Sequence, residues 1–493
     1  MGFGGGEWQQ VATRVMVRFR FRKIESGYWD LGWRYGERRR RGGDGEKIRP
    51  IGGRPPPVDD FRLRCTVGKR GDAERGISMT QDREDRISAL PRNIIDGILG
   101  LLPVEDAARS SILSKEWRYI WATLPYLVLD KLFCNKLAAR SQYVFKETID
   151  KILLQHLGDV VKFDLDVSGV QLSLCPDIDR WMLYVTRNGV KKLTLNMSNN
   201  STYKLPSYIY NCPTLTHLKL FNCVFKPPTS FLGFPKLVTL HLEQITFVPT
   251  AEFCVINAPL LVLLALMYCN GTKYLNIGSS RLNTLVVCEN HYNVELSCFM
   301  NCKSLTALHL VIHNSISAER SKFEKLLSLP TLKVLNLTAP FLELLSAGAV
   351  PQGLPFTLNC LSNLMLGVNF SQMSQISYSL ELIKSSPNLS KLEILVSASS
   401  DTVEAVSEYL DTPDCLDQPL NKLKYVVIHL FTGSNTELFF VKLLFARCPS
   451  LTSMSIKQVK PSGSKEERNI VIELARFRRA SPKAELLYFP YSD

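Results

Sequence analysis

Two pairs of side chains in the sequence have types and a spacing that could bind a metal ion. His309 and His313 stand four residues apart, and so do Cys298 and Cys302. Histidines at this spacing hold zinc when both lie on one helix and a glutamate follows the first. Here His309 belongs to a predicted strand and a leucine follows it. The cysteine spacing is not typical of a structural zinc site either, so we predict that no residue of this chain ligates a metal.

The motifs that carry nucleophilic or phosphate-binding chemistry are missing from the sequence as well. It contains no G-x-S-x-G, no G-x-x-x-x-G-K-[ST], and no G-x-G-x-x-G between a strand and a helix. The seven histidines suggest no catalytic triad. We therefore predict a protein that is not an enzyme, with no catalytic residue and no cofactor.

Composition favours several domains or a repeat array, because 493 residues exceed one ordinary core. The most apolar run, Leu260–Cys269, has half of the roughly 20 residues that a membrane helix needs. The first residues lack the apolar segment of a secretory signal, and thirteen scattered cysteines suggest no disulfide framework. We expect a protein of the nucleus and/or cytoplasm that does not bind membranes.

The positive charge is concentrated in residues 1–80. Of the net charge of +13, residues 1–79 carry +8, and they are rich in Gly, Pro and Arg without a sustained period. We expect this basic tail to be disordered. An Arg cluster could bind nucleic acid or direct nuclear import, but a solvated tail is the favoured interpretation. A start codon chosen too early is a further alternative, since Met79 precedes a stretch that resembles an ordinary beginning.

Three short apolar segments within residues 86–125 predict three helices. Pro91 suits the first turn of the first helix, Pro103 ends it, and Ser114 suits the N-cap of the third. The first helix carries an apolar stripe of helical period made of Ile94, Ile95, Ile98, Leu99 and Leu102. So small a module cannot bury all of its apolar surface by itself. Physics alone leaves two alternatives open, a docking module for a partner and a helical cap on the next domain.

Residues 85–130 resemble an F-box. The similarity rests on the "LP" at Leu90–Pro91, the Ile/Leu stripe, "LLPVEDAARSSILSKEWRYIW", and the tryptophan in the third helix. Ser114 differs from the Cys of many members. The resemblance implies docking on a Skp-family adaptor and, through it, on a cullin ubiquitin ligase. By position, the adaptor-binding residues would be Leu90, Pro91, Ile94, Ile98, Leu99, Leu102, Pro103, Val104, Ala107, Ser110, Leu113 and Trp117.

A repeat of the form L-x-x-L-x-L follows the box, and we assign residues 131–420 to it, with its last two copies falling in the segment beyond. Clear copies begin at Leu215, Leu237, Leu261, Leu282, Leu305 and Leu332, and looser copies begin at Leu361, Leu389, Leu423 and Leu451. The last two leucines of a copy alternate with other residues, so they point to one side of a short strand. Stacked strands make these leucines a continuous core. The pattern predicts an irregular leucine-rich-repeat solenoid with parallel strands on its concave face.

The residues between the inward leucines are predicted to face outward from the concave sheet. Candidate target-binding residues are His217, Lys219, Thr239, His241, Glu243, His309 and Asn336. The alternative is an ordinary solvated face, which is favoured for any single one of these residues.

The last segment, residues 421–493, predicts helices over 437–449 and 467–480 and a closing strand over 483–489. "CPSLTSMSI" and "FRRASPKAELLYF" in it resemble the FBD domain of plant F-box/leucine-rich-repeat proteins. We expect this α/β segment to cap the open end of the solenoid.

Together these features predict the target-recognition subunit of an SCF-type (Skp–cullin–F-box) ubiquitin ligase, in which the repeats bind a target protein. Two alternatives remain, a scaffold outside any ligase and a nucleic-acid-binding protein that acts through the Arg-rich tail. The sequence does not identify the target protein.

Overall fold

The computed structural model describes most of the chain after residue 86. The described residues are 20–23 and 29–32 (backbone only), 87–171, 176–198, 202–248, 253–271, 274–288, 299, 302–311, 320–347, 353–398, 408–410, 412–416, 418–459 and 464–490. Contacts divide the chain into two units, Met1–Asp82 and Arg83–Asp493. In the first unit, β1 (Arg20–Lys23) and β2 (Trp29–Gly32) pair antiparallel. The predicted disorder of residues 1–80 otherwise lies outside the described residues.

The second unit opens with the predicted helical box. It consists of α2 (Arg92–Leu99), α3 (Val104–Arg109), the 3-10 turn η1 (Ser110–Ile112) and α4 (Lys115–Ala122). Ser114 caps α4 as predicted, because its hydroxyl accepts a hydrogen bond of 3.1 Å from the Trp117 backbone N–H. The first helix is shorter than predicted: α2 ends at Leu99, and Pro103 is instead the N-cap of α3.

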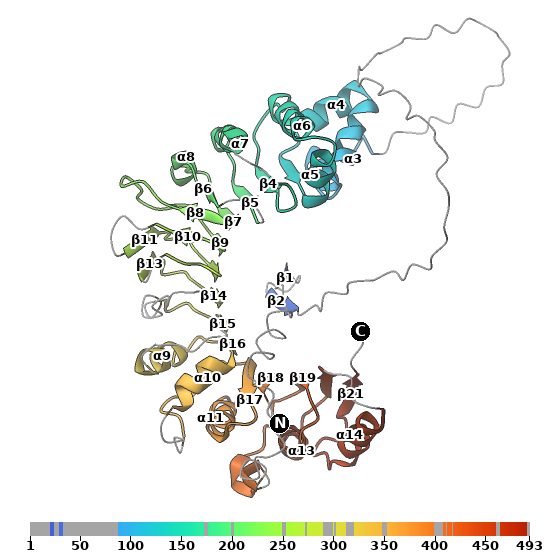
Figure 1. Ribbon diagram of the computed structural model, residues 1–493, viewed down its shortest axis with the longest axis vertical. Coiled ribbons are helices and arrows are strands. Elements are labelled where there is room, and N and C mark those ends of the chain that lie inside the picture. Colours follow the sequence, from blue (N-terminus) through green and yellow to red (C-terminus); the bar gives the residue numbers. More distant parts are fainter. Residues whose placement is uncertain are drawn as a thin grey trace, which may run out of the picture. The chain divides into compact units, whose positions relative to one another are not determined.

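One parallel sheet of fourteen strands runs through the rest of the unit and confirms the predicted leucine-rich-repeat solenoid (Figure 1). Every strand is hydrogen-bonded in parallel to its neighbours in the sheet. The strands in spatial order are β3 (Tyr126–Leu129), β4 (Lys162–Asp166), β5 (Lys192–Asn196), β7 (His217–Phe221), β9 (Thr239–Glu243), β12 (Leu263–Met267), β14 (Thr284–Cys288), β15 (Ala307–Val311), β16 (Val334–Leu337), β17 (Asn363–Asn369), β18 (Lys391–Ala398), β19 (Tyr425–Phe431), β20 (Ser453–Gln458) and β21 (Glu485–Phe489).

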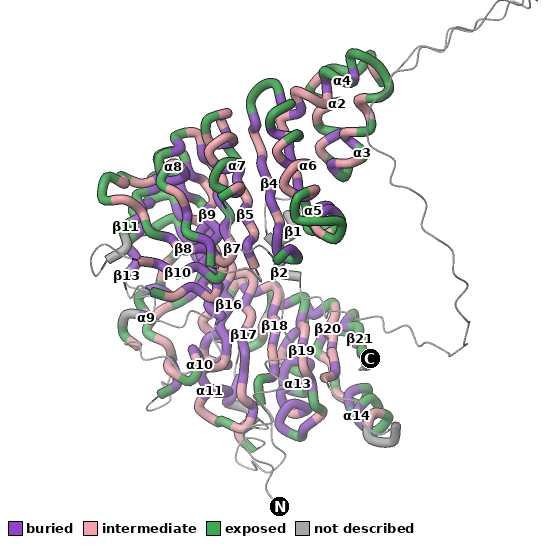
Figure 2. Tube along the Cα trace, turned by 45° about the horizontal axis from the view of Figure 1, so that its top comes forward, coloured by how far each residue is buried: buried purple, intermediate pink, exposed green. Residues whose placement is uncertain are grey.

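The repeat leucines form the core on one face of this sheet. Pairs such as Leu218 and Leu220 on β7 or Leu240 and Leu242 on β9 are fully buried. Figure 2 colours the buried residues purple, and they recur in strand after strand of the sheet. Period two within each strand and stacking between strands thus produce one continuous core.

Different elements cover the core side at different places along the sheet. Helices do so at both ends: α5 (Lys131–Ala138), α6 (Gln142–Leu154), α7 (Pro176–Arg187), α8 (Ser207–Tyr210), α9 (Arg320–Leu327), α10 (Ala339–Ser346), α11 (Met373–Lys384), α13 (Asn435–Arg447) and α14 (Ser464–Arg476). Near the middle, short strands take their place: β6 (Tyr203–Lys204), β8 (Cys223–Phe225), β10 (Thr246–Phe247), β11 (Phe253–Asn257) and β13 (Tyr274–Gly278). Among the described residues, no helix has the length and apolar character to cross a membrane.

Three successive repeats turn at their strand ends through a residue with positive φ. Asn222, Gln244 and Tyr268 have φ values of 55°, 55° and 54°. Each backbone N–H donates to the last carbonyl of the next strand, as from Gln244 to Met267 at 2.8 Å. This left-handed conformation costs a residue with a side chain about 1–2 kcal/mol.

Gln244→Gly is therefore expected to be more stable than Gln244→Ala by about 1 kcal/mol, since only glycine adopts positive φ without strain. The Gln244 side chain is exposed, so both changes remove few contacts. Urea unfolding of both variants measures the difference. Equal stability would show that the turn stores no strain.

The C-terminal segment continues the same sheet. The parallel ladder passes from β18 to β19 without interruption, so the predicted boundary at residues 420–421 does not coincide with a break in the sheet. The predicted helices and closing strand appear as α13, α14 and β21, although α14 begins and ends a few residues earlier than predicted.

Candidate functional site

The helical box has a small core of its own. Its buried apolar residues are Ile95, Leu99, Ala107, Trp117, Ile120 and Leu124. The indole N–H of Trp117 donates to the Ser88 hydroxyl at 2.9 Å, so the polar atom of this large side chain is satisfied. The Arg92 guanidinium joins the helices, because it donates to the Ile120 carbonyl at 2.9 Å and pairs with Asp96 at 2.8 Å.

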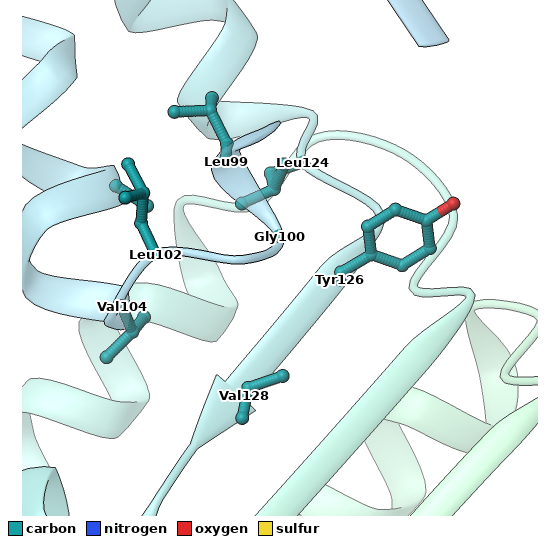
Figure 3. Close-up of a pocket in the computed structure, with 8 residues that line it drawn as sticks. Leu99, Gly100, Leu102, Val104, Leu124, Tyr126 and Val128 are labelled. Carbon is teal, nitrogen blue, oxygen red and sulfur yellow. The ribbon is translucent and has the colours of Figure 1, made fainter. Parts of the chain in front are cut away.

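The box also packs on the first strand of the solenoid. Val104 belongs to the main core, and Lys136 of α5 pairs with Glu105 of α3 at 2.8 Å. Figure 3 shows the junction, where Leu99, Leu124 and Tyr126 surround a hollow of about 10 Å³. That volume holds about one water molecule at most, so the hollow is a packing gap rather than a ligand site.

A broad apolar face of the box remains uncovered by the second unit's described residues. The predicted stripe divides in two: Ile95 and Leu99 point into the core, while Ile94 and Ile98 stay exposed. Leu101, Ile112 and Leu113 are 87%, 77% and 70% exposed. One side of the box therefore packs on the solenoid, as the cap alternative predicted. Another side stays open, and docking of a partner there stays a prediction.

The predicted adaptor-binding residues divide into two groups in the structure. The exposed group comprises Leu90, Pro91, Ile94, Ile98, Leu102, Pro103 and Leu113, and Ser110 is half-buried. The other group, Leu99, Val104, Ala107 and Trp117, is buried inside the chain. Leu99, Ala107 and Trp117 belong to the box core and Val104 belongs to the main core, so none of the four presents a free surface in this structure. Their role in adaptor contact stays a prediction. Sequence reasoning missed the exposed Ile87, Leu101, Ile112 and Tyr119.

The candidate target-binding residues lie on the concave face, opposite the repeat leucines. Strand register places Lys219 beside His241 and His309 beside Asn336. These four occupy one row across the sheet, which also contains Ala265, Val286, Met365 and Glu393. His217 and Thr239 form a second row, and Glu243 lies in a third.

Not all of these side chains are exposed as the sequence predicted. Lys219 is exposed, and His217, Thr239 and Glu243 are half-buried. His241, His309 and Asn336 are buried. Burial lowers the pKa of His309 to about 4, so its imidazole is neutral near pH 7. The predicted contact role of these three is therefore not supported by their exposure in the structure.

Sequence reasoning also missed a charged cluster on this face. The Glu393 carboxylate meets Lys391 Nζ at 2.7 Å and His429 Nε2 at 3.2 Å. Burial favours a higher pKa for Glu393, but the hydrogen bonds and charges of His429 and Lys391 outweigh it and hold the pKa at about 2. The signal was present, since Glu393 stands between the two inward residues of the looser copy at Leu389.

Acid should therefore destabilise the protein through Glu393. Its pKa lies near 2 when folded and near 4.5 when unfolded, so its contribution is complete above pH 4.5 and is lost as pH falls toward 2. Between roughly pH 5 and pH 3 the wild type should lose about 2 kcal/mol more than Glu393→Gln. Urea unfolding at the two pH values measures this, and parallel losses in both proteins would contradict it.

Across the part of the chain that the structure describes, no three His, Cys, Asp or Glu side chains gather as metal ligands. Cys302 is buried, and its thiol lies 3.8 Å from the Ser279 carbonyl. Cys298 and His313 lie outside the described residues.

A helical box joined to a leucine-rich-repeat solenoid defines the class of F-box/leucine-rich-repeat proteins. Models of known families agree: the F-box domain matches residues 87–129, and "FBD-associated F-box protein At5g56370, LRR repeats" matches residues 178–394. The F-box/FBD/LRR-repeat protein At1g13570 of Arabidopsis thaliana is 33% identical over 416 residues, which cover 82% of this chain and 98% of the relative. The chain belongs to the F-box/FBD/LRR-repeat family.

Other similar proteins agree less closely. The F-box/FBD/LRR-repeat protein At3g26920 of Arabidopsis thaliana is 25% identical over 84% of this chain and 98% of its own length. Among solved structures, a leucine-rich-repeat protein of Leptospira interrogans aligns over 73% of this chain and 93% of its own, with 16% identity and a TM-score of 0.28.

Proposed function

We propose that this protein is the target-recognition subunit of an SCF-type ubiquitin ligase in the nucleus or cytoplasm. Its F-box docks on a Skp-family adaptor that connects it to a cullin, and its repeats hold the target protein. The main support for the proposal is the exposed apolar face of the F-box. Other apolar residues of the box already form its core, so the residues of this face are not needed to hold the box together.

The energetics of that face favour an obligate partner. Leu101, Ile112 and Leu113 are each more than two-thirds exposed, and Ile94 and Ile98 are nearly half exposed. Covering one such side chain fully is worth about 1.5–3 kcal/mol. Several together supply enough free energy to offset the cost of association and leave a stable complex. A solvated cap would not need so many apolar side chains on its outer surface.

The chain would act by proximity. A target held on the repeats stays near the ubiquitin-conjugating enzyme that the cullin recruits, which raises the effective concentration of target lysines. The row from Lys219 to Glu393 has a charged side chain at each end, and both of these side chains reach the surface of the concave face. Such charges suit a protein ligand, because charge complementarity orients a partner and selects it.

Co-purification with a Skp-family adaptor tests the proposal. The full chain should bind the adaptor, and the double change Leu90→Ala, Pro91→Ala should weaken binding markedly without altering the melting temperature, since both residues are exposed. Leu232→Ala is the matched control, because Leu232 is an exposed leucine in a solenoid loop. Absence of adaptor binding by the wild type overturns the adaptor role.

Target lifetime separates the ligase subunit from a scaffold that carries an F-box. Proteins captured by the chain while the proteasome is inhibited should become longer-lived when the chain is depleted. Unchanged lifetimes, together with intact adaptor binding, would favour the scaffold.

A further inference from the structure

The two edges of the fourteen-stranded sheet differ in what covers them. At one edge, α3 of the F-box packs against β3, and box residues close the junction around Tyr126. At the other edge is β21, and no described strand pairs with its outer side. Leu487 and Phe489 of β21 are 41% and 48% exposed. An apolar edge strand without a cover is a template for pairing with another strand.

The parallel ladder determines which backbone groups of β21 bond to β20 and which point away from it. The Glu485 N–H donates to the Thr452 carbonyl at 2.9 Å, and Glu485–Phe489 align with Ser453–Lys457. In a parallel ladder, alternate residues turn both backbone groups toward the same neighbour. Residues 485, 487 and 489 therefore bond to β20, and Leu486 and Tyr488 direct their N–H and C=O to the outer edge.

This edge complements itself about a twofold axis through Leu487. In an antiparallel pair centred there, Leu486 of one copy and Tyr488 of the other exchange two backbone hydrogen bonds, and symmetry repeats the exchange. Leu487 then faces Leu487 of the second copy at a non-hydrogen-bonded position, where side chains approach most closely. Phe489 faces Glu485 of the second copy. The pairing gives hydrogen-bond partners to the backbone groups that point away from β20 and covers the exposed leucine.

Charge supports the same alignment. Lys457 is the neighbour of Phe489 on β20. With strands about 4.8 Å apart, Glu485 of the second copy would lie two strands from Lys457, across Phe489. Both side chains are long enough to meet over the phenyl ring, and the twofold axis provides this ion pair twice.

The outer surface of α14 gives a second reason to expect that another molecule covers this end of the solenoid. Val471 and Ile472 are exposed on it, at the same end of the solenoid as β21. Terminal repeats that face only water usually have a polar outer surface. The predicted C-terminal cap therefore exposes apolar side chains at its own outer surface.

We propose that a second copy of this chain occupies the β21 edge, in an antiparallel strand pair centred on Leu487. Head-to-tail growth is not available, because the β3 edge that would receive β21 is covered by the F-box. The isologous pair closes at two copies. The F-boxes stand at the far ends of the joined sheets, so a dimer presents two adaptor sites and gains avidity for a target with two binding segments.

Sedimentation velocity of the full chain over a wide protein concentration range tests the dimer. A strand-edge contact is small, so the wild type should pass from monomer to dimer in the micromolar range. Leu487→Lys should shift this transition to at least about tenfold higher concentration, because it places two like charges opposite each other. Leu232→Lys, the same change at an exposed loop leucine, should leave it unchanged. A wild type that stays monomeric at its highest soluble concentration overturns the proposal.

Cysteine cross-linking tests the register. The background replaces Cys360, the exposed thiol among the cysteines whose side chains the structure describes, with serine. It also replaces the four cysteines whose side chains lie outside the described ones, Cys65, Cys175, Cys254 and Cys298. In this background, L487C should form a disulfide-linked dimer under mild oxidation. F489C should not, because its two copies stand about four residues apart along the paired strands. Equal cross-linking of both variants, or of neither, contradicts the pairing. Leu487→Lys should retain adaptor binding, so failure of the dimer and failure of the proposed function are distinguishable.

Discussion

Replacing both Ile94 and Ile98 with aspartate is expected to lower affinity for a Skp-family adaptor by at least about 100-fold, which corresponds to roughly 3 kcal/mol. The two side chains lie one turn apart on the exposed face of α2, and the box core is formed by their neighbours Ile95 and Leu99. The double change therefore removes apolar contact with the partner and buries charge, while the box stays folded. Isothermal titration calorimetry with the purified adaptor measures the loss.

The matched control for this prediction is Leu232→Asp, which places the same charge at an exposed apolar residue of the solenoid. It should bind the adaptor like the wild type. Circular dichroism should show unchanged melting for both proteins. Wild-type affinity in the double variant would mean that the exposed face of α2 is not the docking surface.

Glu437→Ala should lower the free energy of unfolding by about 3 kcal/mol, because it leaves several buried donors without an acceptor. The Glu437 carboxylate is almost fully buried at the start of α13. It accepts hydrogen bonds from the backbone N–H groups of Thr432 and Gly433 at 2.8 and 3.2 Å, and from two hydroxyls. Ser434 in turn caps the Glu437 N–H, so the two residues form a reciprocal cap.

Chemical denaturation measures this loss, with Glu147→Ala as the control. Glu147 pairs with Lys151 on the exposed side of α6. Exposed pairs of this kind contribute about 0.5 kcal/mol or less. If Glu437→Ala and Glu147→Ala lower the free energy of unfolding equally, the cap of α13 is not what stabilises the C-terminal segment.

The repeats could be predicted from sequence because their signal is local and recurs. Alternation of leucines within a strand, such as Leu218 and Leu220, needs only period two to show which side is buried. The end of α2 was harder, since Leu102 continues the helical period although the helix stops at Leu99. Periodicity also could not show that Ile94 is exposed while Ile95 is buried. Both lie in one broad apolar stripe, and only tertiary packing decides which side of the stripe is buried.

Features that depend on several repeats at once could not be predicted. The row that joins Lys219 to Glu393 needs the register of eight strands, and insertions between the later copies obscure that register in the sequence. The burial of His241 and His309 follows from the same arrangement. The sequence predicted a closing strand over 483–489, but it did not show that Leu487 and Phe489 stay exposed there, because exposure depends on how the last elements pack.

Hydrogen–deuterium exchange of the full chain, with and without a Skp-family adaptor, tests the central claim most directly. The account predicts that adaptor binding slows exchange in α2 and in the segment from Leu101 to Leu113, and leaves β12 and β14 unchanged. Protection confined to the solenoid, with the apolar face of the F-box exchanging as before, would contradict it.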